Sequence, residues 1–130
     1  ARTLCVGEPT DAVRGLCRRR DELWDRLVEA CRPGRATSGL LDAYQQSGEP
    51  LPAMPVAHGL GLGFDPPVVS PALRATAEAD ILEEGMVLAV TAYVWERGVG
   101  AVFTRDAVLI TADGAEILST APAYGESVHG

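Results

Sequence analysis

The stretch VAHGLGLGFDPPVV, residues 56–69, decides how this chain is interpreted. Its glycines alternate at positions 59, 61 and 63, which predicts a strand without side chains on one face, so that another backbone or a ligand approaches closely. The G-x-G-x-G spacing matches neither the Walker phosphate loop nor the dinucleotide-binding pattern. His58 stands at the mouth of this run and is a candidate functional residue, with a plain structural histidine as the alternative.

Two helices are predicted before this stretch. The first begins after Thr10, its expected N-cap, carries apolar residues at near-helical spacing, and ends at Arg32-Pro33-Gly34. The second runs from Thr37, also an expected N-cap, to Gly48. The charged residues of both helices are expected to form solvated faces rather than binding surfaces.

Antiparallel strands are predicted after it. Residues 70–84 are compatible with one helical turn within 72–79 or with an irregular loop. Strands are expected at 86–95, 99–104, 107–111 and 115–118, with turns at Glu96-Arg97-Gly98 and Asp113-Gly114. Residues 1–119 then form one domain, and residues 120–130, which include His129, form a flexible tail.

Composition excludes several function classes. The 130 residues carry a formal net charge of −7, which argues against a nucleic-acid partner, and no apolar run approaches the ~20 residues of a membrane span. The three cysteines make no disulfide framework, and Cys17 and Cys31 lie about 21 Å apart on one predicted helix, too far to pair. A reducing, cytoplasmic location is expected. No cysteine or serine stands in a known nucleophile motif.

The order and spacing of several motifs resembles the pita-bread metallopeptidases, the superfamily of Xaa-Pro aminopeptidases, Xaa-Pro dipeptidases, methionine aminopeptidases and creatinases. The resemblance spans about residues 1–119. Its motifs are RT at 2–3, VGEPT at 6–10, RPG at 32–34, HGLGL at 58–62, the Pro-Pro pair at 66–67, LEEGMVL at 82–88, GVGAV at 98–102 and DAVLITADGAEIL at 106–118.

This resemblance implies an α/β (α+β) pita-bread fold, represented by its C-terminal portion, with two helices on a curved, mainly antiparallel sheet. In the family, two metal-binding Asp precede the position that residue 1 matches. If a longer gene product exists, we expect this chain to be its C-terminal portion. A half-domain exposes a core edge, so the expected partners are a second copy in a homodimer, the missing N-terminal part, or both.

The family site, as the resemblance implies, holds two metal ions with two Asp, one His and two Glu and activates a water for amide hydrolysis. His58 matches the metal-binding His, whereas Thr91 and Arg105 stand at the positions of the two Glu. Asp65, next to Pro66, remains where the family often has a His-Glu pair.

These substitutions argue against a dinuclear centre, because hard divalent ions need carboxylate ligands and a guanidinium repels a cation. No cofactor is therefore expected; the alternative is a divalent metal, Mn, Co or Zn, with His58 as a ligand. Arg105 can instead extend into solvent or pair with Asp106 or Glu96, and Thr91 can be a neutral space-filler.

Three functions follow. In the first, the domain has lost the dinuclear site and binds a small molecule or peptide, with Arg105 as a forked donor to a carboxylate and His58, Thr91 and Asp65 beside it. In the second, a metal-independent enzyme acts on a small amide or biosynthetic intermediate, with His58 as general acid/base and Arg105 stabilising negative charge. In the third, a metal-dependent Xaa-Pro peptidase completes its metal site with groups outside this chain.

Overall fold

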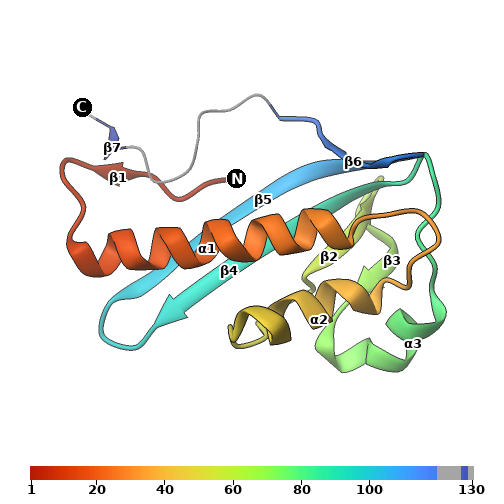
Figure 1. Ribbon diagram of the computed structural model, residues 1–130, viewed down its shortest axis with the longest axis horizontal. Coiled ribbons are helices and arrows are strands. Elements are labelled where there is room, and N and C mark those ends of the chain that lie inside the picture. Colours follow the sequence, from red (N-terminus) through yellow and green to blue (C-terminus); the bar gives the residue numbers. More distant parts are fainter. Residues whose placement is uncertain (120–126, 129–130) are drawn as a thin grey trace.

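The computed structural model describes residues 1–119 and 127–128 and shows a helical layer on one face of a five-stranded sheet (Figure 1). The sheet is antiparallel throughout, in the order β3-β2-β4-β5-β6. Its strands are β2 (Ala57–Leu60), β3 (Phe64–Val69), β4 (Val87–Glu96), β5 (Gly100–Thr111) and β6 (Gly114–Ile117). The architecture confirms the predicted α/β class, with helices on a mainly antiparallel sheet.

A second, two-stranded sheet joins the front of the chain to its end. β1 (Cys5–Val6) pairs in parallel with β7 (Ser127–Val128). The predicted flexible tail spans residues 120–130. Apart from the two residues of β7, these residues (120–126 and 129–130, with His129 among them) lie outside the described residues.

β4 and β5 form one long hairpin whose register runs from Val87 opposite Leu109 to Glu96 opposite Gly100. The prediction of two separate strands at 99–104 and 107–111 is wrong, because β5 is continuous across Arg105 and Asp106. Neither residue forms a turn here, and both pair with β4. This continuity keeps the side chains of the whole hairpin in a single alternating order.

The helices confirm most of the predicted boundaries. α1 (Asp11–Ala30) is capped by Thr10, whose side chain accepts a hydrogen bond from the Val13 N–H at 3.3 Å. α2 (Ser38–Ser47) ends at Gly48, which has a φ of 76°. The Thr37 hydroxyl does not cap α2 as predicted; it donates to the carbonyl of Ala77 at 2.9 Å and ties α2 to the next helix.

The uncertain segment 70–84 is helical in its first part. A 3₁₀ turn, η1 (Pro71–Leu73), leads into α3 (Arg74–Ala79), which confirms the helical alternative for 72–79 and adds a third, short helix to the two that were predicted. None of the described helices is long and apolar enough to cross a membrane.

Side chains alternate along β4 and β5, so that one face of the hairpin packs into the core and the other carries the candidate site. Even-numbered side chains of both strands pack under α1 and α2, where burial of apolar surface stabilises the fold. The buried residues of this layer include Leu16, Leu23, Leu27, Leu40, Leu41, Leu88, Val90, Ala92, Val94, Val102, Val108 and Ile110. Odd-numbered side chains, among them Thr91 and Arg105, therefore point to the face away from the helices, called here the open face.

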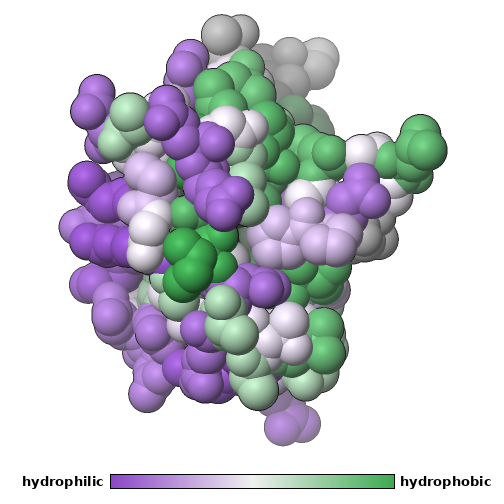
Figure 2. Space-filling view, turned by 90° about the vertical axis from the view of Figure 1, so that its right-hand side faces the viewer, coloured by the Kyte–Doolittle hydropathy of each residue, from purple (hydrophilic) through white to green (hydrophobic). Residues whose placement is uncertain are grey.

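The glycine-rich stretch forms the β2–β3 hairpin. A Cβ atom on Gly59 would collide with the carbonyl of Pro66, and one on Gly61 with the carboxylate of Asp65. The predicted close approach is thus confirmed, although β2 ends at Leu60 and the last two glycines of the run lie beyond it. The hairpin carries exposed Leu60 and Leu62, and Figure 2 shows an apolar projection on the side that faces away from the helices.

Candidate functional site

Thr91 and Arg105 lie directly opposite each other on β4 and β5. The Arg105 Nε–H donates to Thr91 Oγ1 at 2.9 Å. Thr91 is 2% exposed, whereas Arg105 is partly exposed. Two positions that the sequence identified separately, 14 residues apart, are therefore one hydrogen-bonded pair.

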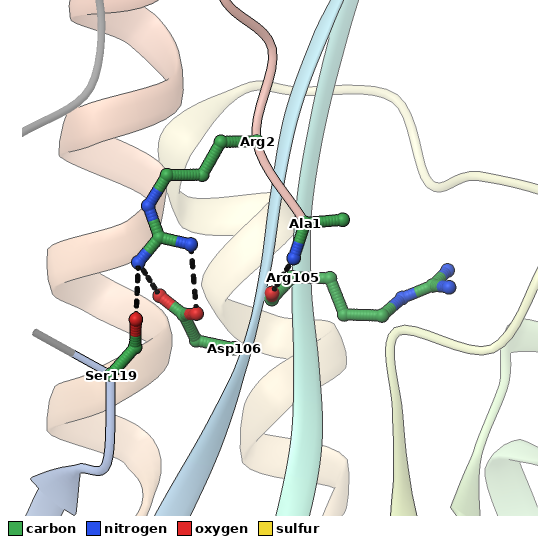
Figure 3. Close-up of polar contacts among 5 residues, drawn as sticks. All are labelled: Ala1, Arg2, Arg105, Asp106 and Ser119. Atoms are coloured by element: carbon green, nitrogen blue, oxygen red, sulfur yellow. Dashed lines mark hydrogen bonds and ion pairs between the residues drawn. The ribbon is translucent and has the colours of Figure 1, made fainter. Parts of the chain in front are cut away.

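The Arg105 side chain leaves β5 on the side opposite to Asp106 (Figure 3). This follows from strand alternation, which sends neighbouring residues to opposite faces of a sheet. Its guanidinium reaches Met54, with Nη2 3.6 Å from Sδ. Met54 belongs to the segment before β2, so a sulfur atom and a hydroxyl, both uncharged, flank the cation.

Neither carboxylate considered as a partner for Arg105 pairs with it. Asp106 accepts two hydrogen bonds from Arg2, at 2.9 and 2.6 Å, and Glu96 lies 3.6 Å from Arg19. Within residues 1–119, Arg105 has no ion-pair partner, and it is held in place by Thr91 rather than extended into solvent. Among residues 1–119, the structure thus presents an oriented guanidinium whose charge is not neutralised by a neighbouring acid.

The first three residues run beside β5 at the same level. The α-amino group of Ala1 donates to the carbonyl of Arg105 at 2.6 Å, and the Arg105 N–H donates to the carbonyl of Ala1 at 2.8 Å. On the helix side, Arg2 also bonds Ser119 Oγ at 3.1 Å (Figure 3). These contacts fix the backbone of Arg105 from the edge of β5.

Tyr44 supports the other member of the pair and was missed as a site residue. Its hydroxyl donates to the carbonyl of Thr91 at 2.7 Å and accepts from the Tyr93 N–H at 3.0 Å. It takes the place of a neighbouring strand, because β2 pairs with β4 only up to Val90. Burial raises the pKa of Tyr44 well above its usual range. The sequence signals only a tyrosine on the buried face of a helix.

His58 lies on β2, one row along the sheet from Thr91. It pairs with Ala89, which pairs with Ala107, so its side chain shares the open face with Arg105. Ordinary strand spacings put the His58 and Arg105 Cα atoms about 12 Å apart, within reach of one small ligand. His58 Nδ1 is 2.8 Å from the carbonyl of Gly59. Because a carbonyl only accepts, Nδ1 carries the proton, and Nε2 is the basic nitrogen of the neutral ring.

Asp65 is not brought to the Thr91–Arg105 pair. It lies on β3 opposite Gly59, three strands from β5, or about 14 Å at ordinary strand spacing. Its carboxylate lies against Gly61 within the β2–β3 hairpin. Of the four predicted site residues, the sheet gathers Thr91, Arg105 and, one row away, His58.

The donor atoms of the Thr91–Arg105 pair differ from those that a divalent metal requires. A divalent cation needs oxygen or nitrogen lone pairs, but Thr91 and Arg105 present a hydroxyl engaged by a permanently charged N–H donor. Across the described ranges, no cluster of three or more His, Cys, Asp or Glu is suited to a metal ion. The pair therefore does not fit as a two-carboxylate metal ligand set.

Comparison with known proteins places the chain in a family. Residues 1–112 match the model of metallopeptidase family M24. The chain belongs to this family. The match and the structural neighbours confirm the resemblance to the pita-bread peptidases that the motifs indicated. No curated protein sequence matches this chain.

Solved structures show the same fold. Xaa-Pro dipeptidase from Bacillus anthracis is 26% identical with a TM-score of 0.74, and prolidase from Pyrococcus furiosus is 28% identical with a TM-score of 0.74. The alignments cover 98% and 93% of this chain but 36% of each of those chains. Methionine aminopeptidase from Thermotoga maritima, 20% identical over 87% of this chain and 54% of its own with a TM-score of 0.61, is similar in fold. The chain spans about a third of the length of the two dipeptidases.

Proposed function

We propose that this M24-family chain forms the C-terminal portion of a peptidase-like domain in which the Thr91–Arg105 pair binds the carboxylate of a small molecule or peptide, without a dinuclear metal site. The observation that carries the proposal is the 2.9 Å hydrogen bond that aims Arg105 across the open face. The guanidinium has no acid partner in residues 1–119.

The chemistry of arginine supports this assignment. A guanidinium keeps its charge at every physiological pH and offers a planar fork of donors that matches a carboxylate. With Nε engaged by Thr91 and Nη2 beside the Met54 sulfur, a weak acceptor, the Nη groups are the donors that remain for a ligand. Because the chain carries a net charge of −7, an anion would be drawn to this point by the local cation and not by the overall field.

A second function, a metal-independent enzyme, is favoured by the orientation of His58. Its Nδ1 contact with Gly59 leaves Nε2 as the basic nitrogen, as a general base requires. In that function Arg105 would stabilise negative charge that develops on the substrate. A metal-dependent Xaa-Pro peptidase, the activity in the names of the dipeptidase neighbours, would need ligands other than Thr91 and Arg105.

Alanyl-proline tests these functions together, because it has one free carboxylate and one Xaa-Pro bond. Binding is followed by saturation-transfer NMR and cleavage by the appearance of free proline, with and without added Mn²⁺. We expect binding without cleavage, and a loss of affinity of about 1.5–3 kcal/mol in Arg105→Gln, the range for a hydrogen bond to a charged group.

Arg97→Gln is the matched control, because Arg97 is an exposed arginine in the β4–β5 turn. Unchanged binding in Arg105→Gln would contradict carboxylate capture. Cleavage that needs no metal and disappears in His58→Ala would favour the enzyme. Cleavage that occurs only with Mn²⁺ would favour the third function, a metal-dependent Xaa-Pro peptidase.

A further inference from the structure

Three aromatic side chains continue the open face beyond Arg105. The row next to Thr91–Arg105 consists of Tyr93 and Phe103, and the following row consists of Trp95 and Ala101. Directly opposed residues of an antiparallel pair share a face, and successive rows on that face are about 6.8 Å apart. Tyr93, Phe103 and Trp95 therefore form a stripe, called here the aromatic stripe, with the guanidinium at one end.

The stripe is accessible along its length. Trp95 is 44% exposed, and Ala101 opposite it is small and exposed. Tyr93 and Phe103 are partly buried. Met54, the neighbour of the guanidinium, is exposed as well, so apolar surface lies on the open face beside the charge. An exposed tryptophan on the side of a sheet that the helices do not cover is a surface suited to an apolar partner.

We propose that the open face takes the C-terminal end of an extended apolar peptide, with its terminal carboxylate on Arg105 and its side chains over the aromatic stripe. This inference rests on the proposed function and names its ligand class. Charge complementarity selects the carboxylate end, because the cation lies at one end of an otherwise uncharged stripe.

The spacing agrees with this occupant. The distance from the Arg105 row to the Trp95 row is four residues of β4, about 13.6 Å, which is the length of four extended residues. In an extended peptide, alternate side chains point the same way and repeat about every 6.8 Å, the same interval as the rows of the stripe. Two apolar side chains, at the C-terminal residue and two residues before it, would each meet one row.

Trp95 provides a direct readout. The chain has two tryptophans, and the other, Trp24, is buried on α1, so Trp24→Phe leaves Trp95 as the only reporter. The full chain with this substitution is titrated with acetyl-Leu-Ala-Leu, with its C-terminal amide, and with acetyl-Ser-Ala-Ser. We expect a blue shift of the Trp95 emission and affinities about tenfold or more weaker for the amide and for the serine peptide.

Two variants separate the carboxylate from the stripe. Arg105→Gln should abolish the preference for the acid over the amide and keep the preference for leucine over serine. Phe103→Ser should do the reverse, and Arg97→Gln should change neither. Each variant is first shown to keep the melting temperature of the parent, so that a lost preference reports the open face rather than the fold.

The failure of this inference differs from the failure of the proposed function. If alanyl-proline binds in an Arg105-dependent manner but leucine and serine peptides bind equally, the carboxylate site stands and the apolar peptide is overturned. If acid and amide bind equally, the peptide inference is overturned, and the proposed function is overturned with it only if alanyl-proline binding does not depend on Arg105. Light scattering adds one further outcome: a dimer that Trp95→Ala converts to a monomer would make a second copy, not a peptide, the occupant of the stripe.

Discussion

The hydroxyl of Tyr44 lies 2.7 Å from the backbone carbonyl of Thr91, and with the Tyr93 N–H it closes the edge of β4 beyond Val90, the residue that pairs with the first residue of β2. Without this phenol, the buried carbonyl of Thr91 and the part-buried N–H of Tyr93 would lose this partner. We expect Tyr44→Phe to lower the free energy of unfolding by about 1–3 kcal/mol, measured by urea denaturation. Tyr93→Phe is the control and should change stability little. An equal effect of the two substitutions would contradict this role of Tyr44.

The raised pKa of Tyr44 predicts how stability depends on alkaline pH. Burial favours the neutral phenol in the folded chain, whereas the unfolded chain ionises this tyrosine near pH 10. Its contribution is therefore complete below pH 10 and declines as pH rises above it. Urea titrations between pH 8 and 11 should show a steeper decline for the parent than for Tyr44→Phe. Parallel curves would contradict the buried phenol.

Arg2 and Asp106 are a second long-range pair, joined by parallel hydrogen bonds at 2.9 and 2.6 Å, with side chains only 13% and 5% exposed. We expect Asp106→Asn to lower the free energy of unfolding by about 1.5–3 kcal/mol, because a buried charged hydrogen bond is lost. The control is Glu8→Gln, which breaks the exposed Glu8–Arg14 ion pair and should have little effect. Equal effects of both substitutions would contradict the burial argument.

Gly59 is predicted to tolerate no side chain. Its added Cβ would collide with the Pro66 carbonyl, which is backbone and cannot rotate away. Gly59→Ala should therefore destabilise the chain by about 1–3 kcal/mol in thermal and urea unfolding, the range for an overpacked site. Gly63→Ala is the matched control, because a Cβ there meets nothing within 4 Å. A neutral Gly59→Ala would show that β3 can shift away from β2.

Cys31 should not react with thiol reagents in the folded chain. It is fully buried at the C-cap of α1, and burial raises the pKa of its thiol to about 12. Cys5 and Cys17 are partly exposed and free. At pH 8, a thiol reagent such as dithiobis-nitrobenzoate should label these two cysteines in the native chain and all three in guanidinium. Native labelling of Cys31 at the rate of Cys17 would contradict its burial.

Much of the fold could be predicted from sequence because its signals are local. Thr10 and Gly48 mark helix ends through their own capping and φ preferences, and the apolar spacing between them identifies the buried faces. Thr37 shows the limit of such local signals. Its type and position predict a cap, but the Ala77 carbonyl, 40 residues away, is its partner. The continuity of β5 was missed for a related reason, since pairing with β4, not local propensity, holds Arg105 in the strand.

The candidate site, like the fold, could be predicted only in part from the sequence. Motif order located Thr91, Arg105 and His58, and antiparallel register brings the first two together. The partners of these side chains could not be predicted from the sequence. No local pattern shows that Arg105 bonds Thr91 rather than Asp106, and none shows that Tyr44 contacts Thr91. Asp65 was selected for its place in a motif, and the hairpin that carries it holds it three strands from β5.

The measurement that tests the central claim most directly is the metal content of the longest natural form, by elemental mass spectrometry after incubation with Mn²⁺, Co²⁺ or Zn²⁺ and removal of the excess. The account predicts near-zero retention, because Arg105 and Thr91 supply an N–H donor and an engaged hydroxyl where a metal needs carboxylates. Retention of two metal ions per chain, unchanged in Arg105→Gln, would contradict it.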